Sequence, residues 1–228
     1  MYLIEKTINK LYQDGFTNFL NPKDLKDVTD HLKKNTYCIY KPYPFSEKNI
    51  LYQDETPKVV LLEIKVGDTI RHQDILGSLY HLGVDDSLFG DIVITNNHYY
   101  FYILEVMKPF FEMEFTKIRN LNIKLIERDI NLLDDYEPNY DEIQVITSSL
   151  RIDSVIAKVI HTNRDEIKDL IKDKKIIYNY DILKDNNKIL KEDDVFSIRK
   201  IGKFKFDEII GHTKKDNYVL RILKYKAE

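Results

Sequence analysis

RIDSVIAKVIHTNRDEIKDLIKDKKIIYNYDILKDNNKILKEDDVFSIRKIG, residues 151–202, is the stretch that best reveals how this chain is organised. Apolar residues recur at helical spacing in two short segments, at 152–160 and 167–171, and a compact β-rich sequence follows them. The first predicted helix buries one apolar face and leaves Arg151, Ser154 and Lys158 on a different side. We therefore expect a small α/β module with basic side chains at its surface.

The second predicted helix combines a good start with a charged outer face. Thr162 or Asn163 is suited to cap it. Its cations recur at i, i+4 and i+8, and we call them the α-ridge: Arg164, Lys168 and Lys172, with Lys174 and Lys175 just beyond the helix end. Such a row is suited to neutralise phosphates, and we interpret the module as RNA-binding.

An acidic row accompanies the α-ridge and supports a second interpretation. Asp165, Asp169 and Asp173 run alongside the basic residues. Each cation would then make a weak surface ion pair worth roughly 0.3–0.5 kcal/mol. The residues alone leave both interpretations open.

Charge is unevenly divided along the 228 residues. Residues 1–150 hold 16 Lys+Arg against 24 Asp+Glu, net -8, whereas residues 151–228 hold 19 against 14, net +5. This asymmetry favours a polyanion as partner of the C-terminal third, although a lysine-rich solvated surface would give the same count. The 43% hydrophobic content suffices for two or three folded domains.

Cysteine content and the N-terminus restrict the compartment. The single cysteine, Cys38, excludes an intramolecular disulfide, and we expect a buried free thiol in a reducing environment. The N-terminus lacks the pattern of a secretory signal, and no apolar run approaches about 18 residues. We therefore expect a cytoplasmic protein with no membrane partner.

The first part of the chain reads as an N-terminal α/β region, residues 1–56. Apolar spacing predicts a helix over 2–13, stopped by Gly15. Asn21 as N-cap and Pro22 as first residue predict a second helix to about Lys34, and Tyr37–Tyr40 a strand. Proline-containing sequence to about Thr56 is predicted to be a connection.

Residues 57–130 show the order β-α-β-β-α-β. The predicted strands are 59–66, 91–95, 98–104 and 123–127, the helices 75–82 and 106–115, and Asn96-Asn97 the turn of a hairpin. This order predicts a ferredoxin-like domain in an α+β protein. A linker with a short strand, residues 131–147, then leads to a C-terminal module, residues 148–228, closed by a hairpin of 204–210 and 218–223.

Two motifs in this part invite a chemical interpretation. Tyr99–Tyr102 alternates between strand faces, so an exposed pair would stack on bases, whereas a covered pair would only pack. His72-Gln73-Asp74 places a histidine near a carboxylate, but residues two apart at a helix start do not face each other, and capping explains Asp74. We predict no catalytic residue, no metal site and no cofactor.

The order of landmarks in the C-terminal module resembles the S-four RNA-binding domain. These landmarks are Arg151-Ile152-Asp153, Asn163-Arg164, Leu170-Ile171, Ile176–Asn179 and Asp193-Asp194-Val195. Two residues depart from that family, which has glycine where this chain has Lys174 and Tyr180. Both departures put the local turn geometry in question.

The resemblance extends over nearly the whole chain to the YlmH family of bacterial proteins. It is carried by Phe19–Pro22, Leu61–Ile64, His72–Gly77, Gly90–Val93, Ser148–Asp153 and Gly202–Phe204. It implies a non-enzymatic RNA-binding protein that binds rRNA and tRNA on the large ribosomal subunit, in quality control of stalled peptidyl-tRNA complexes. An older link of the family is to cell-division gene clusters.

Carried over by position, the resemblance implies RNA contacts in the C-terminal module. They are Arg151, Thr162, Asn163, Arg164, Lys168, Lys172, Lys174, Lys175 and Asn179, and Lys200 and Lys203 would extend the footprint. One alternative is an accessory protein of RNA-modifying or tRNA-related enzymes, although their catalytic motifs are missing. The other is an adaptor whose acidic N-terminal two-thirds bind a protein partner.

Overall fold

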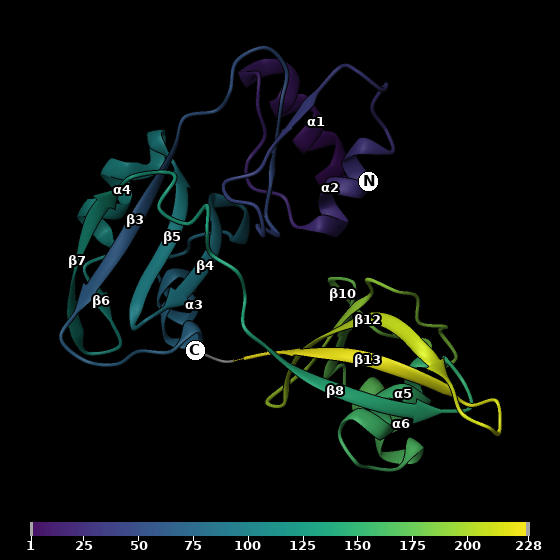
Figure 1. Ribbon diagram of the computed structural model, residues 1–228. Coiled ribbons are helices and arrows are strands. Elements are labelled where there is room, and N and C mark those ends of the chain that lie inside the picture. The colour runs from purple at the N-terminus through teal and green to yellow at the C-terminus, as the bar shows by residue number, and fades with distance from the viewer. Residues whose placement is uncertain (1, 227–228) are drawn as a thin grey trace. The chain divides into compact units, whose positions relative to one another are not determined.

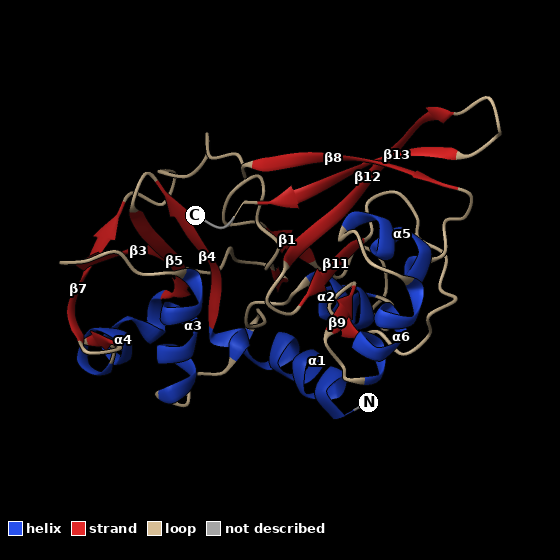
Figure 2. Cartoon of the chain, turned by 90° about the horizontal axis from the view of Figure 1, so that it is seen from below, coloured by secondary structure: helices blue, strands red, loops and turns tan. Residues whose placement is uncertain are grey.

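The computed structural model describes residues 2–226 (Figures 1 and 2). The chain forms two compact units, which divide between Glu137 and Pro138. Each unit contains both helices and strands, which confirms the predicted α+β class. The division of the first unit into residues 1–56 and 57–130 stays a prediction.

Among its described residues, the first unit contains four α-helices and two short 3-10 helices beside its strands. In chain order its elements are α1 (Tyr2–Asp14), α2 (Pro22–Thr29), β1 (Cys38–Tyr40), β2 (Ile50–Tyr52), β3 (Val59–Val66), α3 (His72–His81), η1 (Asp86–Leu88), β4 (Phe89–Thr95), β5 (His98–Leu104), η2 (Glu105–Met107), α4 (Lys108–Glu114), β6 (Lys117–Ile118) and β7 (Leu121–Arg128).

The main sheet of this unit has the order β4-β5-β3-β7-β6, and all its pairings are antiparallel. Without the short β6, this is the strand order of a ferredoxin-like domain, so that prediction is confirmed. Leu62, Ile64 and Phe101 face α3 and α4 and belong to one apolar core. Leu61 and Tyr102 face the other side, where Phe19 from the N-terminal segment packs on them.

The β4–β5 hairpin closes as the sequence predicts. Asn96 and Asn97 have φ of 50° and 59°, the left-handed pair that a two-residue turn of this kind needs. The strand after the turn is covered on both sides, because Tyr99–Tyr102 are each at most 8% exposed. The idea that these aromatic rings stack on bases is therefore wrong, and the alternative, packing under a neighbouring segment, is confirmed.

The N-terminal region departs from prediction in three places. Asn21 caps α2, but the helix ends at Thr29 rather than Lys34, since turns follow it and Asn35 is left-handed. Strand β2 was not predicted. Cys38 is exposed, not buried, because β1 has only β2 as a neighbour and its first two side chains face solvent.

The second unit is a six-stranded sheet with two helices packed together on it (Figures 1 and 2). Its elements are β8 (Tyr140–Thr147), α5 (Ile152–Val159), α6 (Arg164–Lys172), β9 (Ile176–Tyr178), β10 (Asp181–Ile182), β11 (Val195–Ile198), β12 (Gly202–His212) and β13 (Tyr218–Tyr225), and the strand order is β10-β9-β11-β12-β13-β8. Strand β8 is longer than the short strand expected in a linker, since all eight of its residues pair with β13.

Candidate nucleic-acid interface

A buried carboxylate connects the two helices of the second unit. Asp153, in the first turn of α5, is 0% exposed. Arg151 Nη2 donates to Asp153 Oδ2 at 2.8 Å, and Arg164 Nη2 donates to the same oxygen at 2.8 Å. Burial favours a raised pKa for Asp153, but hydrogen bonds from Arg151 and Arg164 outweigh it and lower that pKa. Both guanidinium groups are thus fixed, with part of each exposed.

The start of α6 is held by its own side chains. Asn163 is the N-cap, and its Oδ1 accepts from Glu166 N at 2.9 Å. The Glu166 carboxylate accepts from Thr162 Oγ1 and, at 2.8 Å, from Asn163 Nδ2. Thr162 and Asn163 therefore have structural roles, and their predicted RNA contacts stay untested predictions that would compete with Glu166.

The α-ridge is only partly a free cationic surface. Arg164 points to Asp153, Lys168 Nζ lies 2.8 Å from Asp165, and Lys175 Nζ lies 2.6 Å from Asp173. The interpretation as surface ion pairs with the acidic row fits Lys168 and Lys175, whereas Arg164 pairs with the buried Asp153 outside that row. Lys172 and Lys174 are exposed, and neither makes an ion pair within residues 2–226.

The end of α6 keeps the geometry that the missing glycine would favour. Lys174 has φ of 55°, its N–H donates to Ile171 O, and Lys175 N donates to Leu170 O, each at 2.9 Å. This is a Schellman motif with lysine at the left-handed position. The first glycine departure thus changes the charge of the turn and not its shape.

The second departure, Tyr180 in place of glycine, also keeps the left-handed backbone that glycine would favour. Asn179 and Tyr180 have φ of 44° and 66° and form the two-residue turn between β9 and β10. The Asn179 side chain donates to Asp194 Oδ1 at 2.8 Å and accepts from Val195 N at 2.9 Å. Asn179 therefore fixes the turn, and its predicted RNA contact stays an untested prediction.

Two surface turns bring further cations to the end of α6. Arg199 N donates to Lys175 O at 2.9 Å, so the β11–β12 turn lies against the turn that follows α6. Arg199 and Lys200 are both exposed. We define the turn patch as Lys172, Lys174, Arg199 and Lys200. Sequence reasoning missed Arg199, although its position beside Lys200 before a strand was a usable signal.

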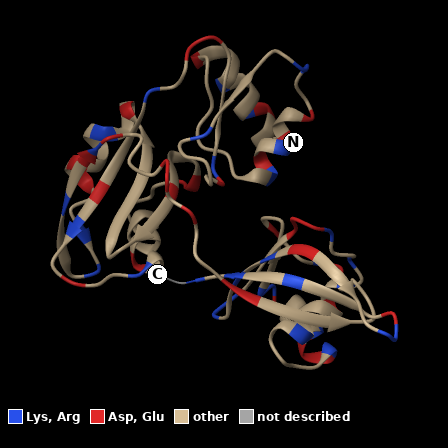
Figure 3. Cartoon of the chain, viewed as in Figure 1, with Lys and Arg blue, Asp and Glu red and all other residues tan. Residues whose placement is uncertain are grey.

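The remaining predicted cation is engaged with aromatic rings. Lys203 Nζ lies 4.7 Å from the ring centroid of Tyr225 and 5.5 Å from that of Tyr180. Figure 3 shows basic and acidic residues interspersed over this unit, and not one uninterrupted basic face. The turn patch is therefore the part of the predicted site that keeps exposed cations together.

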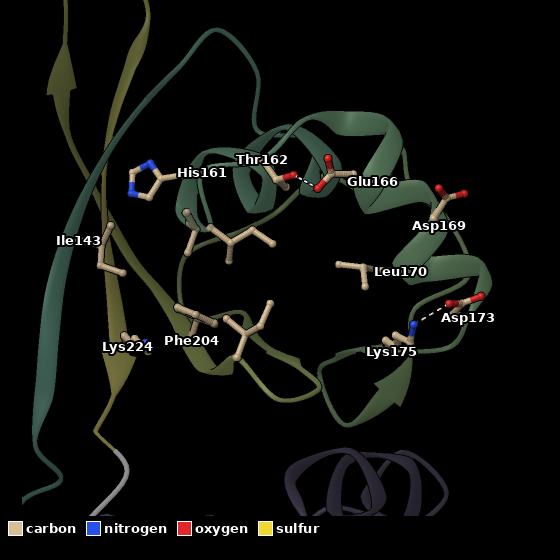
Figure 4. Close-up of a pocket in the computed structure, with 13 residues that line it drawn as sticks. Ile143, His161, Thr162, Glu166, Asp169, Leu170, Asp173, Lys175, Phe204 and Lys224 are labelled. Atoms are coloured by element: carbon tan, nitrogen blue, oxygen red, sulfur yellow. Dashed lines mark hydrogen bonds and ion pairs between the residues drawn. The ribbon is translucent and has the colours of Figure 1, made fainter.

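A cavity of about 730 Å³ lies beside α6 and is lined by Glu166, Asp169 and Leu170 of that helix (Figure 4). Its floor includes Ile143, Leu170 and Phe204, and its rim carries Glu166 and Asp169. Thr162 and Lys175 of the predicted RNA site also line it, but carboxylates repel phosphate, so the cavity itself is a poor place for a phosphate group.

The sequence predicts no metal site, and His72 and Asp74 form the motif nearest to one. No group of three or more potential metal ligands occurs within residues 2–226. Asp74 bonds to the backbone and side chain of Arg71 and so caps α3, as its structural interpretation predicts. None of the helices in that range is both long enough and apolar enough to cross a membrane.

Comparisons with known proteins find one family model and one curated protein that resemble this chain. Residues 54–132 match the family model described as "Putative RNA-binding domain in YlmH". The chain is 27% identical over 233 residues to "Ribosome-associated protein quality control protein P2" of Bacillus subtilis (strain 168), with 94% of this chain and 88% of that protein covered. Neither description names an enzyme.

Among solved structures, "Cell division protein ylmH from Streptococcus pneumoniae" aligns with a TM-score of 0.46 and 21% identity, over 57% of this chain and 89% of that one. The family-model match lies on the ferredoxin-like domain, and the Bacillus subtilis relative covers both units. The chain is thus similar to a YlmH domain over residues 54–132 and to the Bacillus subtilis protein over both units.

Proposed function

We propose that this protein binds structured RNA of the large ribosomal subunit, rRNA together with a bound tRNA, in the quality control of stalled peptidyl-tRNA complexes. The observation that carries the proposal is the turn patch of the second unit. Four exposed cations lie there, at the end of α6 and in the two turns that adjoin it. The name of the Bacillus subtilis relative supports the ribosomal setting.

The turn patch is suited to phosphate recognition through charge and rigidity. Lys174 sits in a hydrogen-bonded helix end, and the backbone bond from Arg199 to Lys175 fixes the second turn. Cations held in this way neutralise phosphates with little ordering cost, and the release of counterions makes binding salt-dependent. About 12 Å separates the two ends of α6, by its rise per residue, so Arg151 and Arg164 would contact a different phosphate group.

The buried Asp153 has a positioning role in this proposal. It orients Arg151 and Arg164 while each keeps an exposed portion. An arginine fixed by one carboxylate still presents further N–H donors to a phosphate. The proposal includes S-four-type recognition of shaped RNA by the second unit. That the first unit binds a protein partner stays a prediction.

Co-sedimentation with purified large ribosomal subunits tests the proposal. We expect Lys172→Glu and Lys200→Glu each to lower affinity about tenfold and to reduce the salt slope by about one. Lys214→Glu is the matched control, since Lys214 is also exposed and lies in the β12–β13 turn. Equal binding by all three variants would contradict the site.

The quality-control setting needs a second comparison. Subunits that carry peptidyl-tRNA should bind the wild-type protein more tightly than vacant subunits do, because the tRNA adds phosphates to the site. Equal affinity for both would restrict the protein to rRNA binding.

A further inference from the structure

The sheet face turned away from α3 and α4 carries a polar cluster that the proposed function does not use. Side chains alternate along β3, so Leu61, Glu63 and Lys65 lie on this face while Leu62 and Ile64 face the helices. Part of the face is covered, because Leu61 belongs to the core that includes Phe19. Glu63 and Lys65 continue the face towards the end of β3.

A buried carboxylate organises this cluster. Glu63 is 1% exposed, and its Oε1 contacts Lys65 Nζ and, at 2.6 Å, His98 Nδ1. Its Oε2 accepts from Arg128 Nε at 2.6 Å and Nη2 at 2.5 Å. Burial alone would raise the pKa of Glu63, but the hydrogen bonds from Lys65, His98 and Arg128 lower it to about 2.

The hydrogen-bond donors around Glu63 are anchored at one end and exposed at the other. The side chains of Lys65, Arg128 and His98 are 42%, 39% and 47% exposed. His98 also stacks on Tyr100, with ring centroids 6.1 Å apart and an interplanar angle of 12°. The buried carboxylate and the ring stack thus hold three donors in place at the surface.

A further cation, Lys124, has no counter-charge among the described residues. Lys124 on β7 lies directly opposite Lys65 on β3, so the two side chains share a face. Lys124 is exposed and makes no ion pair within residues 2–226. Like charges directly opposite in a sheet are unfavourable, and one carboxylate leaves a net charge of +2 among Glu63, Lys65, Lys124 and Arg128.

This local surplus contrasts with the charge of the domain. Residues 54–132 hold 8 Lys+Arg against 13 Asp+Glu, net -5. The nearest acidic residue along β7, Glu127, points to the helix side and pairs with Lys108. Figure 3 shows basic residues together at one end of β3 and β7. An anion would therefore be repelled from most of the domain and attracted to this end of its sheet.

We propose that Lys65, His98, Lys124 and Arg128, the sheet patch, bind the sugar-phosphate backbone of an RNA strand. The inference rests on the proposed function, that the protein binds RNA, and adds a second contact on the first unit. The match of residues 54–132 to an RNA-binding description supports RNA as the anion. Recognition here is by charge, since Tyr100 and Tyr102 are covered and do not stack on bases.

Lys124→Glu is the sharpest test, because Lys124 has no partner to lose and the new carboxylate would face Lys65. The full chain is titrated against purified large ribosomal subunits at several salt concentrations. We expect affinity to fall about tenfold and the salt slope to decrease by one or more. The Tm should stay equal or rise, which separates lost binding from unfolding.

Lys58→Glu is the control, with the same charge change at an 83% exposed lysine just before β3, away from Lys65; its one ion pair, with Glu105 at 3.9 Å, is at the surface. If Lys124→Glu binds as Lys58→Glu does while Lys172→Glu is weakened, the sheet patch is wrong and the proposed function stands. If Lys124→Glu alone is weakened, the sheet patch stands and the turn patch fails. Salt-insensitive or absent binding of the wild type overturns both.

Discussion

Two buried carboxylates, Glu63 in the first unit and Asp153 in the second, are each paired with cations, but the basic residues around them differ. Each is at most 1% exposed, and each is neutralised by more than one cation. Around Asp153 the basic residues continue into ion pairs such as Lys168 with Asp165. Around Glu63 they continue into Lys124, which has no counter-charge in the described chain.

The difference shows that net charge does not locate an anion site. The basic C-terminal third pairs several of its cations with carboxylates, among them Arg151, Arg164 and Lys168. The acidic remainder nevertheless contains a small cationic surplus on one sheet face. What matters for a phosphate is the number of exposed cations beyond those that the fold already neutralises.

The largest expected change in the free energy of unfolding is at Asp153, and it tests whether this carboxylate is a structural centre. Asp153→Ala leaves Arg151 and Arg164 facing each other without a carboxylate, and we expect the free energy of unfolding to fall by about 3 kcal/mol. Chemical denaturation measures it. The control is Asp165→Ala, which removes only an exposed pair and should cost less than about 1 kcal/mol. Similar losses in both variants would show that Asp153 is not a structural centre.

The pH dependence of stability sharpens the comparison at Glu63. The folded-state pKa of about 2 lies below the ordinary value of 4.5, so the stabilisation is complete above pH 4.5 and is lost as the pH falls towards 2. Glu63→Gln should remove this contribution. Its free energy of unfolding should therefore fall less steeply over that window, by up to about 1.4 kcal/mol per pH unit.

The measurement for Glu63 is denaturant unfolding at several pH values between 2 and 5. Asp153 has the same direction of shift and is present in both proteins, so it cancels in the difference. Parallel pH profiles for wild type and Glu63→Gln would contradict a lowered pKa for Glu63 in the folded protein.

The smallest effect is expected at Lys174, where charge and backbone strain oppose each other. Lys174→Gly should raise the free energy of unfolding by about 0.5–1 kcal/mol, because glycine adopts φ of 55° without penalty. It should also weaken binding to large subunits, since a cation of the turn patch is lost. Lys172→Gly is the control, because glycine in the last helical turn destabilises. A lower free energy of unfolding in Lys174→Gly would show that the left-handed backbone at Lys174 is not strained.

Sequence reasoning located the elements whose signal is local. The Asn96-Asn97 turn, the Asn21 cap and the ferredoxin-like order follow from residues that are neighbours in the chain. The cationic row on α6 was also correct as a pattern. Its pairing was not predictable, because Arg164 meets Asp153 only through the packing of α5 against α6.

The misses have the same physical origin. Burial of Cys38 depends on how many strands flank β1, and the length of β8 depends on a partner some 70 residues further along the chain. The sheet patch was missed for a related reason. Lys65, His98, Lys124 and Arg128 are scattered in sequence, and only strand register places them on one face.

The pairing of β8 has a consequence for the order in which the second unit folds. In the described sheet β8 has β13 as its single neighbour. Because β13 comes some 70 residues later in the chain, β8 leaves the ribosome long before its partner is made. Until then its backbone donors and acceptors can bond only to water, and the sheet is closed by contacts that are distant in sequence. Folding of this unit should therefore be slow relative to its helices, and it should be completed only once β13 has left the ribosomal tunnel.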